Sequence, residues 1–449
     1  MPKTIKNVFE LISSPRNIYG AYLNARQDKR YKKDVLKFSA NLVDNLYRVR
    51  QRILAGDFQP GPYFEFYVYE PKCRLIMAQP FEDRVAQWAF CQVLNPLLEK
   101  GYITDSYASI RGRGQIRAVN RLHYWLRIVD KKNNTPCYPM EKVLQTLADA
   151  GWVCTEEKEL AKFEKPGRKR PVLLNISRAM LSPNGLRELE QRARVTFPDA
   201  PEVEKWYSLK LDISKFYYRV SHEVLLRELE RKISDQHVLA WARANLCNNN
   251  INFGLPPGKK PEEVPRDQRI PGRGMPVGAL FSQMFSNFYL NPMDQFAKRR
   301  LGIQYYLRFA DDTIILSNNK QQLHEWKETL GGFLNEELQL DLNEKVCIRP
   351  ITLGIDFCGF KVWSNHIKMR KSTALRMKRN LKRVMDEYAA GEMDLPQAKE
   401  VVSSYMDLLS RCDSYELRKA IFGEYSDTEW TEGWFVLKHN SAKIEEHGE

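Results

Sequence analysis

The chain has 449 residues, 43% of them hydrophobic, which is enough for two or three packed units with real cores. Its net charge of +14 makes an extended polyanion a natural partner, and the alternative is a basic protein without a special ligand. No run of about 18 apolar residues predicts a membrane span, and the N-terminus lacks the apolar core of a secretion signal. The eight cysteines form no CxxC pair, so we expect reduced thiols in a cytoplasmic protein and no zinc site.

The N-terminal part of the chain changes from helical to strand-like spacing. Residues 1–60 are charged and carry apolar side chains at helical spacing, which predicts a helical region. The alternating residues 63–69 and the apolar residues 74–77 then predict two strands of a hairpin. Lys72 and Arg74 lie near its turn, where two cations could cover a nucleoside triphosphate. An ordinary surface hairpin is the alternative.

Two arginines alternate with glycines at residues 111–114. Small neighbours allow a close backbone approach and guanidinium groups are planar donors, so Arg111 and Arg113 are expected to contact phosphates. A plain Arg-Gly loop is the alternative. Further on, residues 128–206 contain a basic run with Pro and Gly at residues 162–170. This run predicts either a solvated loop or an insertion that grips structured RNA through its phosphates.

Three acidic residues follow or join short strand-like stretches. Asp212 comes after the alternating residues 207–211, and Asp311 and Asp312 lie between two runs rich in aromatic and β-branched residues. An Asp-Asp pair alone is commonly a solvated turn. With a second site, the three acids could converge on Mg²⁺, which prefers carboxylate oxygens. Two such ions clamp the attacking and leaving oxygens in phosphoryl transfer.

Three segments in this order resemble motifs A, B and C of reverse transcriptases. They are residues 212–217 (DISKFY), 274–283 (GMPVGALFSQ) and 309–312 (FADD). The similarity is to bacterial stand-alone enzymes of the group II intron, diversity-generating retroelement and defence-associated types. It extends over about residues 35–425, and residues 80–89 and 105–114 resemble parts of the fingers in this family.

The resemblance implies an α+β right-hand polymerase fold with fingers, a palm with an antiparallel sheet, and a helical thumb. The expected divisions are an N-terminal helical region at 1–60, fingers at 61–205 with a basic insertion at about 128–206, a palm at 206–365, a thumb at 366–425 and a C-terminal tail at 426–449.

The resemblance also implies the chemistry. Asp212, Asp311 and Asp312, with the backbone carbonyl of Ile213, would hold two Mg²⁺ ions, for which Mn²⁺ could substitute. The primer 3′ hydroxyl would attack the α-phosphate of a deoxynucleotide, and pyrophosphate would leave. The residues expected to bind the nucleotide are Lys72, Arg74, Phe216, Tyr217, Gly278, Gln283 and Lys345. Tyr217 occupies the position of the bulky aromatic that excludes a 2′ hydroxyl, with a packed core ring as the alternative.

Template and primer contacts are implied at further positions, and residues 371–388 have the basic amphipathic pattern of a thumb helix along a duplex. The expected contacts are Arg111, Arg113, Gly359, Arg376, Arg379 and Lys382. Val277, Gln283 and Phe309 depart from the residues common in relatives, where Gln, Pro and Tyr are usual. The first two departures resemble diversity-generating retroelement enzymes and weaken the case for an intron function.

The expected role is synthesis of cDNA from a dedicated non-coding RNA in antiphage defence. A mutagenic polymerase of a diversity-generating retroelement is the close alternative, and a catalytically silent RNA-binding scaffold is an alternative of another class. The expected partners are the RNA template, deoxynucleotides and an RNA–DNA duplex. An accessory protein or a second copy of the chain is left open, as are the identities of template, primer and product.

Overall fold

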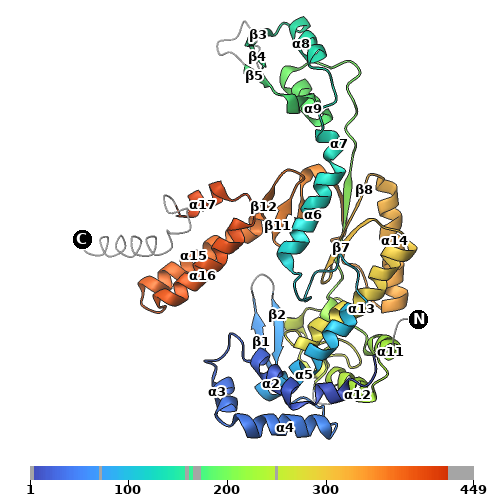
Figure 1. The fold of residues 1–449 in the computed structure, drawn as a ribbon, viewed down its shortest axis with the longest axis vertical. Coiled ribbons are helices and arrows are strands. Elements are labelled where there is room, and N and C mark those ends of the chain that lie inside the picture. Colours follow the sequence, from blue (N-terminus) through green and yellow to red (C-terminus); the bar gives the residue numbers. More distant parts are fainter. Residues whose placement is uncertain (1–4, 70–72, 157–160, 165–172, 248–250, 423–449) are drawn as a thin grey trace, which may run out of the picture. The chain divides into compact units, whose positions relative to one another are not determined.

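The computed structural model describes residues 5–69, 73–156, 161–164, 173–247 and 251–422, and it forms two compact units (Figure 1). The first contains Met1–Ala118, Leu209–Ile315 and Gln321–Ile348, and the second contains Val119–Ser208, Leu316–Lys320 and Arg349–Glu449. Helices are mixed with four small sheets, so the predicted α+β class is confirmed. Within the described residues, no helix is long and apolar enough to cross a membrane.

Short helices form the N-terminal part of the first unit, as predicted for residues 1–60. They are α1 (Phe9–Ile12), α2 (Pro15–Ala25), α3 (Lys33–Ala40) and α4 (Leu42–Leu54), and they pack on α5 (Phe81–Glu99). Ser14 caps α2 by accepting a hydrogen bond from the backbone N–H of Asn17, and Pro15 occupies the first helical position. The amphipathic α4 buries Asn45, Val49 and Ile53 on one face.

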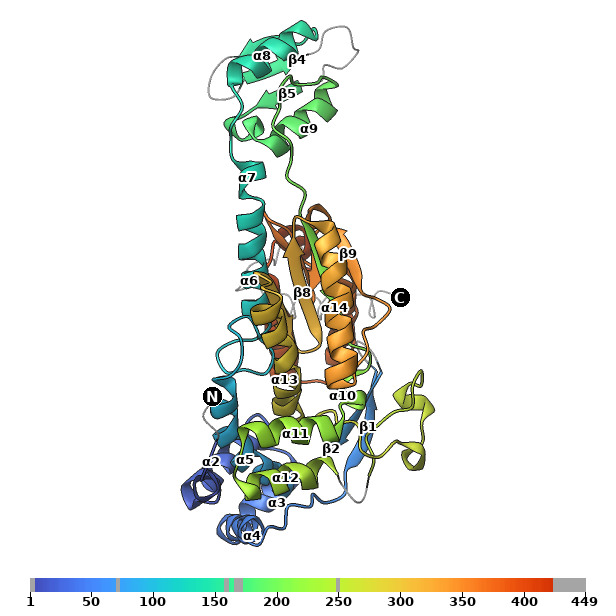
Figure 2. The ribbon, with the colours of Figure 1, turned by 90° about the vertical axis from the view of Figure 1, so that its right-hand side faces the viewer.

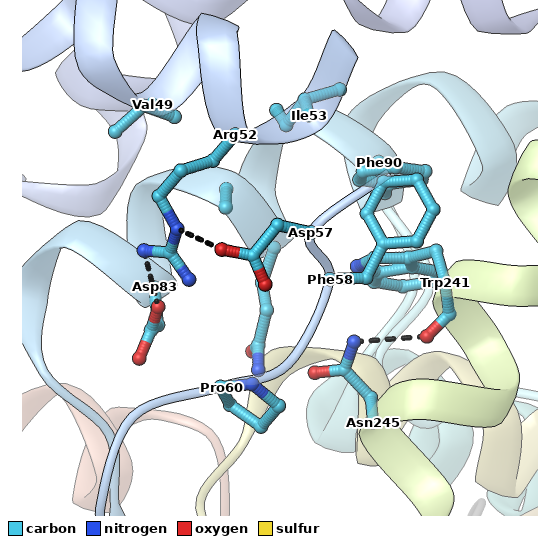
Figure 3. Close-up of a pocket in the computed structure, with 12 residues that line it drawn as sticks. Val49, Arg52, Ile53, Asp57, Phe58, Pro60, Asp83, Phe90, Trp241 and Asn245 are labelled. Carbon is cyan, nitrogen blue, oxygen red and sulfur yellow. Dashed lines mark hydrogen bonds and ion pairs between the residues drawn. The ribbon is translucent and has the colours of Figure 1, made fainter. Parts of the chain in front are cut away.

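A small buried cavity lies where α4 and α5 meet a later helix, α12 (Gln236–Leu246) (Figure 3). The Phe90 and Trp241 rings stack there with centroids 4.3 Å apart. On the other side of the cavity, Arg52 forms an ion pair with Asp83 at 3.1 Å. Burial raises the pKa of the Asp83 carboxyl, and the Arg52 guanidinium opposes that shift. Aromatic packing thus joins α5 to α12, and the ion pair joins α4 to α5.

The predicted hairpin is present as β1 (Phe64–Val68) and β2 (Arg74–Ala78). The two strands are antiparallel, with Phe64 opposite Ala78 and Val68 opposite Arg74. Lys72 lies outside the described residues. The inner face of the hairpin packs Leu75 and Met77 against Ile251 and Phe253.

The strands that carry the three acids form a four-stranded sheet, which belongs largely to the first unit. Its strand order is β7 (Tyr305–Phe309), β8 (Asp312–Ser317), β6 (Tyr207–Leu211) and β9 (Cys347–Pro350). The helices α13 (Leu280–Gln295) and α14 (Lys320–Leu338) lie alongside this sheet (Figure 2). A π-helix over Phe296–Arg300 extends α13. The remaining helical segments are α10 (Phe216–Arg219), α11 (His222–Lys232) and the 3₁₀ turns Pro261–Glu263 and Arg266–Gln268.

Much of the predicted insertion at 128–206 is folded. In the second unit, α8 (Met140–Asp149) and α9 (Pro183–Ala193) lie beside a three-stranded antiparallel sheet of β3 (Val153–Glu156), β4 (Ala161–Glu164) and β5 (Leu173–Ile176) (Figure 1). A 3₁₀ turn, Arg178–Leu181, precedes α9. Buried side chains from Tyr138 to Phe197 form a core of their own. The basic run is described only up to Glu164, and its residues 165–170 lie outside the described residues.

The rest of the second unit consists of helices and a second small sheet. The helices α6 (Gln115–Val129) and α7 (Lys131–Asn134) lead into the insertion. A 3₁₀ turn, Ile351–Leu353, precedes the antiparallel strands β10 (Ile355–Phe357), β11 (Phe360–Val362) and β12 (Ile367–Met369). Then α15 (Lys371–Ala389) and α16 (Leu395–Ser410) lie side by side and share a core with α17 (Tyr415–Phe422) (Figure 1).

The predicted domain limits stay predictions, and the tail at 426–449 lies outside the described residues.

Candidate active site

The Asp-Asp pair lies at the tip of a tight hairpin, as expected. Ala310 and Asp311 form the turn, and Asp312 is the first residue of β8. Ala310 has φ 54°, in the left-handed region that residues with a side chain rarely adopt. Both carboxylates are half-buried. The turn therefore places two adjacent acids near one point, at the cost of local backbone strain.

A buried ion pair beneath the turn holds it in shape. Arg308 donates to both carboxylate oxygens of Asp294, at 2.8 and 2.6 Å, and neither side chain is exposed. Arg308 also donates to the carbonyl of Ala310 at 3.0 Å, and the Tyr306 hydroxyl donates to Asp294 at 2.7 Å. Because removing one partner leaves a buried charge uncompensated, this pair fixes the geometry of the turn.

Asp312 has a partner that the sequence did not reveal. The Lys210 ammonium lies 3.2 Å from its carboxylate, and Lys210 is on β6, the strand beside β8. Both side chains are partly exposed. Lys210 thus supplies the counter-charge that the sequence led us to expect from a metal ion.

Asp212 is tied to the segment that follows α14. The Asn343 amide donates to the Asp212 carboxylate at 2.9 Å, and the Asn343 N–H donates to the Asp212 carbonyl at 2.7 Å. The buried Ile213, whose carbonyl was expected to bind metal, forms an antiparallel bridge with Leu342. Lys345 is exposed, and its backbone N–H donates to the Asn343 side chain at 3.2 Å. Asn343 therefore orients the first acid, although only its segment was noticed in the sequence.

The described residues contain no group of three or more His, Cys, Asp or Glu side chains arranged to hold a metal ion. The expected convergence of Asp212, Asp311 and Asp312 on two ions stays a prediction. Carboxylate oxygens are nevertheless the donors that Mg²⁺ prefers, so the chemistry of the three acids fits that ion. Lys210 and Asn343 now take part of the bonding capacity that the ions would use.

The Tyr217 ring is close to the acid turn. Burial raises the pKa of its hydroxyl, and the Asp311 carboxylate acts in the same direction. A hydrogen bond with Ser286 and the charge of Arg74 oppose this shift. Arg74 is exposed on β2, and Phe216 is buried with its ring centroid 5.4 Å from that of Tyr217. Three of the predicted nucleotide-binding residues, Arg74, Phe216 and Tyr217, therefore share one neighbourhood with Asp311.

Gly278 lies against the hairpin β1–β2. The N–H of Met77 donates to the carbonyl of Val277 at 2.9 Å, and a Cβ on Gly278 would lie 3.1 Å from the Ile76 side chain. Gly278 has φ +105°, which favours glycine. Gln283 is exposed at the start of α13. The glycine thus permits β2 to approach, and its expected contact with a base pair stays a prediction.

A second anchor of the hairpin was not anticipated. Arg269, only 3% exposed at its side chain, donates to both carboxylate oxygens of Glu65 at 2.8 Å each. This bidentate pair lowers the pKa of Glu65 through its hydrogen bonds. Because Glu65 is in β1 and Arg269 is in the loop before residue 274, the pair fixes the strand that runs beside β2.

The two arginines predicted to contact the template differ in their surroundings. Arg111 is exposed. Arg113 donates to the backbone carbonyls of Ile103, Thr104 and Ser106, at 2.9, 2.9 and 2.6 Å. Arg113 therefore stabilises its own loop, which the Arg-Gly spacing could not distinguish from phosphate binding.

In the second unit, Gly359 forms the β10–β11 turn with Cys358, and both have positive φ. Along α15, Arg379 and Lys382 are exposed and Arg376 is half-buried, while Met377, Leu381 and Val384 face the helical core. The predicted amphipathic pattern of this helix is present. Template and primer contacts of these residues stay predictions.

Comparisons by sequence find one family model and one curated protein similar to this chain. The model for "Reverse transcriptase (RNA-dependent DNA polymerase)" matches residues 175–362. Protein YkfC of Escherichia coli strain K12 is 22% identical over 358 residues, which are 72% of this chain and 72% of that protein.

Two solved telomerase structures are also similar. The Candida albicans enzyme, in complex with the TWJ fragment of telomeric RNA, is 13% identical with a TM-score of 0.35 over 87% of this chain and 60% of its own. The apo enzyme of Candida tropicalis is 11% identical with a TM-score of 0.36 over 86% and 66%. The chain thus spans less than two thirds of the length of these telomerase chains. The segment that matches the reverse transcriptase family model includes Asp212, Asp311 and Asp312.

Proposed function

We propose that the chain is an RNA-directed DNA polymerase in which Asp212, Asp311 and Asp312 bind two Mg²⁺ ions. The observation that carries this proposal is the position of the three acids in the matched domain, two at the β7–β8 turn and one directly after the neighbouring strand β6. When bound, the ions would neutralise the negative charge that develops on the phosphate being transferred. Lys210 would then have to release Asp312, which is feasible because the pair is partly exposed.

The side chains around the acids support binding of a deoxynucleotide. Arg74 is exposed beside Tyr217, where a guanidinium suits a triphosphate. The Tyr217 ring would exclude a 2′ hydroxyl by steric contact, which makes DNA the product. Asn343 would hold the Asp212 carboxylate in one orientation while the primer hydroxyl attacks.

The test is incorporation of deoxynucleotides on a supplied RNA template with a DNA primer, in Mg²⁺ or Mn²⁺. We expect the full chain to extend the primer and the Asp311→Ala, Asp312→Ala variant to lose extension while retaining its melting temperature. An Asp267→Asn variant, which changes an exposed acid on a surface loop, is the matched control. Equal extension by the acid variant would contradict the proposal.

A scaffold that binds RNA without catalysis is the second candidate, and the Lys210–Asp312 ion pair favours it. A lysine that pairs with Asp312 offsets one of the two negative charges at the turn, which reduces the need for a metal ion there. Absence of any extension by the wild-type chain, with RNA still bound, would select this candidate.

We further propose that the template is a dedicated non-coding RNA and that the biological role is antiphage defence in a bacterium. The folded insertion with its own core supports a dedicated template, since it adds a module beyond the polymerase motifs. A mutagenic polymerase of a diversity-generating retroelement is the competing role, supported by the form of residues 277–283. Sequencing the nucleic acid that co-purifies from the native locus, and inspecting the neighbouring genes for variable repeats, separates the two.

A further inference from the structure

Two polar hollows flank the tip of the β11–β12 hairpin, in the second unit. They measure about 440 and 470 Å³, and Asn134, Ser364 and Asn365 line both. We call a set of polar and cationic residues that line one or both hollows the hairpin-tip surface. It consists of His123, Arg127, Lys131, Asn134, Thr135, Asn184, Arg187, Ser364, Asn365 and His366.

The hairpin-tip surface is cationic. His123, Arg127 and Lys131 follow one another at intervals of four residues through α6 and α7, which places them on one helical face about 6 Å apart along the axis. Arg187 adds a cation from α9. Within the described part of the chain, neither Arg127, Lys131 nor Arg187 forms an ion pair. These charges are therefore available to a ligand.

The acids near the hollows are already engaged. The Asp130 carboxylate is buried and accepts hydrogen bonds from Asn133, Asn134 and Ser364, at 3.0, 2.7 and 2.7 Å. Glu188 is paired with Arg192 at 3.3 Å. Counted against these two acids, Arg127, Lys131 and Arg187 still leave the lining of the two hollows with a net positive charge.

The hairpin tip is held in one shape. The Trp363 and His366 rings stack with centroids 4.4 Å apart, and the N–H of Trp363 donates to the His366 carbonyl at 2.9 Å. A Cβ on Gly354 would lie 2.4 Å from the Trp363 ring, so only glycine fits there. The Ser364 carbonyl lies 3.2 Å from the His123 ring nitrogen, which joins the tip to α6. The surface is thus largely pre-formed.

We propose that the hairpin-tip surface binds the sugar-phosphate backbone of RNA. The inference rests on the proposed function, which makes RNA the polyanion that this chain must hold. Arginine and lysine bind phosphates, while the surrounding Asn, Ser and Thr side chains offer donors and acceptors for 2′ hydroxyl groups. Among the residues that line the two hollows, only Ile351 and Trp363 are apolar, which favours backbone recognition over a protein partner.

The test measures the affinity of the full chain for a labelled RNA stem-loop and for the DNA stem-loop of the same sequence, by fluorescence anisotropy without nucleotides. The Arg127→Glu, Lys131→Glu variant should bind the RNA at least about tenfold more weakly. It should also lower the slope of log affinity against log salt by about 1.5, since two phosphate contacts are lost. Lys132→Glu, an exposed neighbour outside the hollows, is the matched control and should change affinity much less.

The measurement is repeated in the Asp311→Ala, Asp312→Ala background, so that a failure of polymerisation does not affect it. Ultraviolet crosslinking of the RNA to the wild-type chain, read by peptide mass spectrometry, gives a second measurement that needs no variant. Crosslinks in residues 363–366 or 184–191 are expected. The proposal would be overturned by equal binding of RNA and DNA, by an equal loss of RNA affinity in Lys132→Glu, or by crosslinks found only at other residues. The last outcome would leave this surface to a protein partner.

Discussion

At the scale of single residues, the candidate site depends on partners that are distant in sequence. Asn343 is 131 positions from the acid that it orients, and Lys210 is about a hundred from Asp312. The Asn343 amide orients the Asp212 carboxylate, and the Lys210 ammonium forms an ion pair with the Asp312 carboxylate. The reactivity of the acids is therefore set as much by Asn343 and Lys210 as by the turn itself.

The Asn343→Ala substitution removes the amide that holds Asp212. A hydrogen bond to a charged group contributes about 1.5–3 kcal/mol, so we expect nucleotide incorporation to fall by roughly ten- to hundredfold. The melting temperature should change little because the side chain is partly exposed. Asn335→Ala, which removes a similar bond of 2.9 Å to Asp341, is the control. Equal rates in the two variants would show that Asn343 has no positioning role.

The Tyr217→Ala substitution removes the ring expected to exclude ribonucleotides. Steric rejection of one small group is worth about 1–3 kcal/mol, so the preference for deoxynucleotides should fall by roughly ten- to hundredfold. The measurement is the ratio of kcat/KM for a deoxynucleotide and its ribonucleotide. Tyr217→Phe keeps the ring and should keep the preference; an unchanged ratio in the alanine variant would make Tyr217 a packing residue only.

At the scale of elements, the sequence predicted the two strands of the β1–β2 hairpin but not the contacts that attach the hairpin to the rest of its unit. Alternating residues predicted the two strands correctly. The Arg269–Glu65 pair and the contact of Gly278 with Ile76 were not visible, because both join segments about 200 residues apart. Periodicity reports which face of an element is buried but not which loop covers it.

The Glu65→Gln substitution tests this attachment through pH. The folded pKa of Glu65 lies below its ordinary value of 4.5, so the pair stabilises the fold above that value and loses this effect as the pH falls through the lower folded pKa. At pH 7 the variant should lose roughly 2–3 kcal/mol of stability, because Arg269 stays buried without its partner.

The measurement for Glu65→Gln is thermal unfolding at a series of pH values. The difference from the wild type should shrink as the pH is lowered below about 4.5. Asp267→Asn, on the same loop but exposed, should show no such trend. A difference that stays constant with pH would mean that the charge of Glu65 is not what anchors the hairpin.

Other elements show where reading the sequence succeeds and fails. The β7–β8 turn and the amphipathic α15 were predicted because their signals are local. The sheet β3–β5 was missed, since residues 153–176 were read as part of a basic insertion. Arg113 was expected to contact the template, yet it binds three carbonyls of its own loop. An arginine beside glycines suits both tasks, and only the folded loop distinguishes them.

At the scale of the whole molecule, the chain combines a segment that matches the reverse transcriptase family model with a separately packed module. The module, residues 136–200, has its own buried core and begins and ends at one point. There the Asn133 amide donates to the Glu204 carbonyl at 2.8 Å, and the N–H of Glu204 donates back to Asn133 at 2.8 Å. The segments on either side of the module are therefore joined to each other without it.

Replacing residues 136–200 by a short Gly-Ser linker should leave a folded protein. The two hydrogen bonds between Asn133 and Glu204, which we call the clasp, keep the linker ends together. The melting temperature should therefore shift by less than about 5 °C. RNA affinity should fall, because Arg187 is removed with the module. Circular dichroism and thermal unfolding give the first result and anisotropy the second, and a loss of cooperative unfolding would show that the module is part of the polymerase core.

The clasp at Asn133 and Glu204 also bears on inheritance. A segment whose two ends meet can be gained, lost or exchanged by a single insertion or deletion in the gene, without changing the amino-acid sequence on either side. Such an exchange would leave Asp212, Asp311 and Asp312 unchanged. In relatives of this chain, we expect the segment between Asn133 and Glu204 to be the part that is replaced.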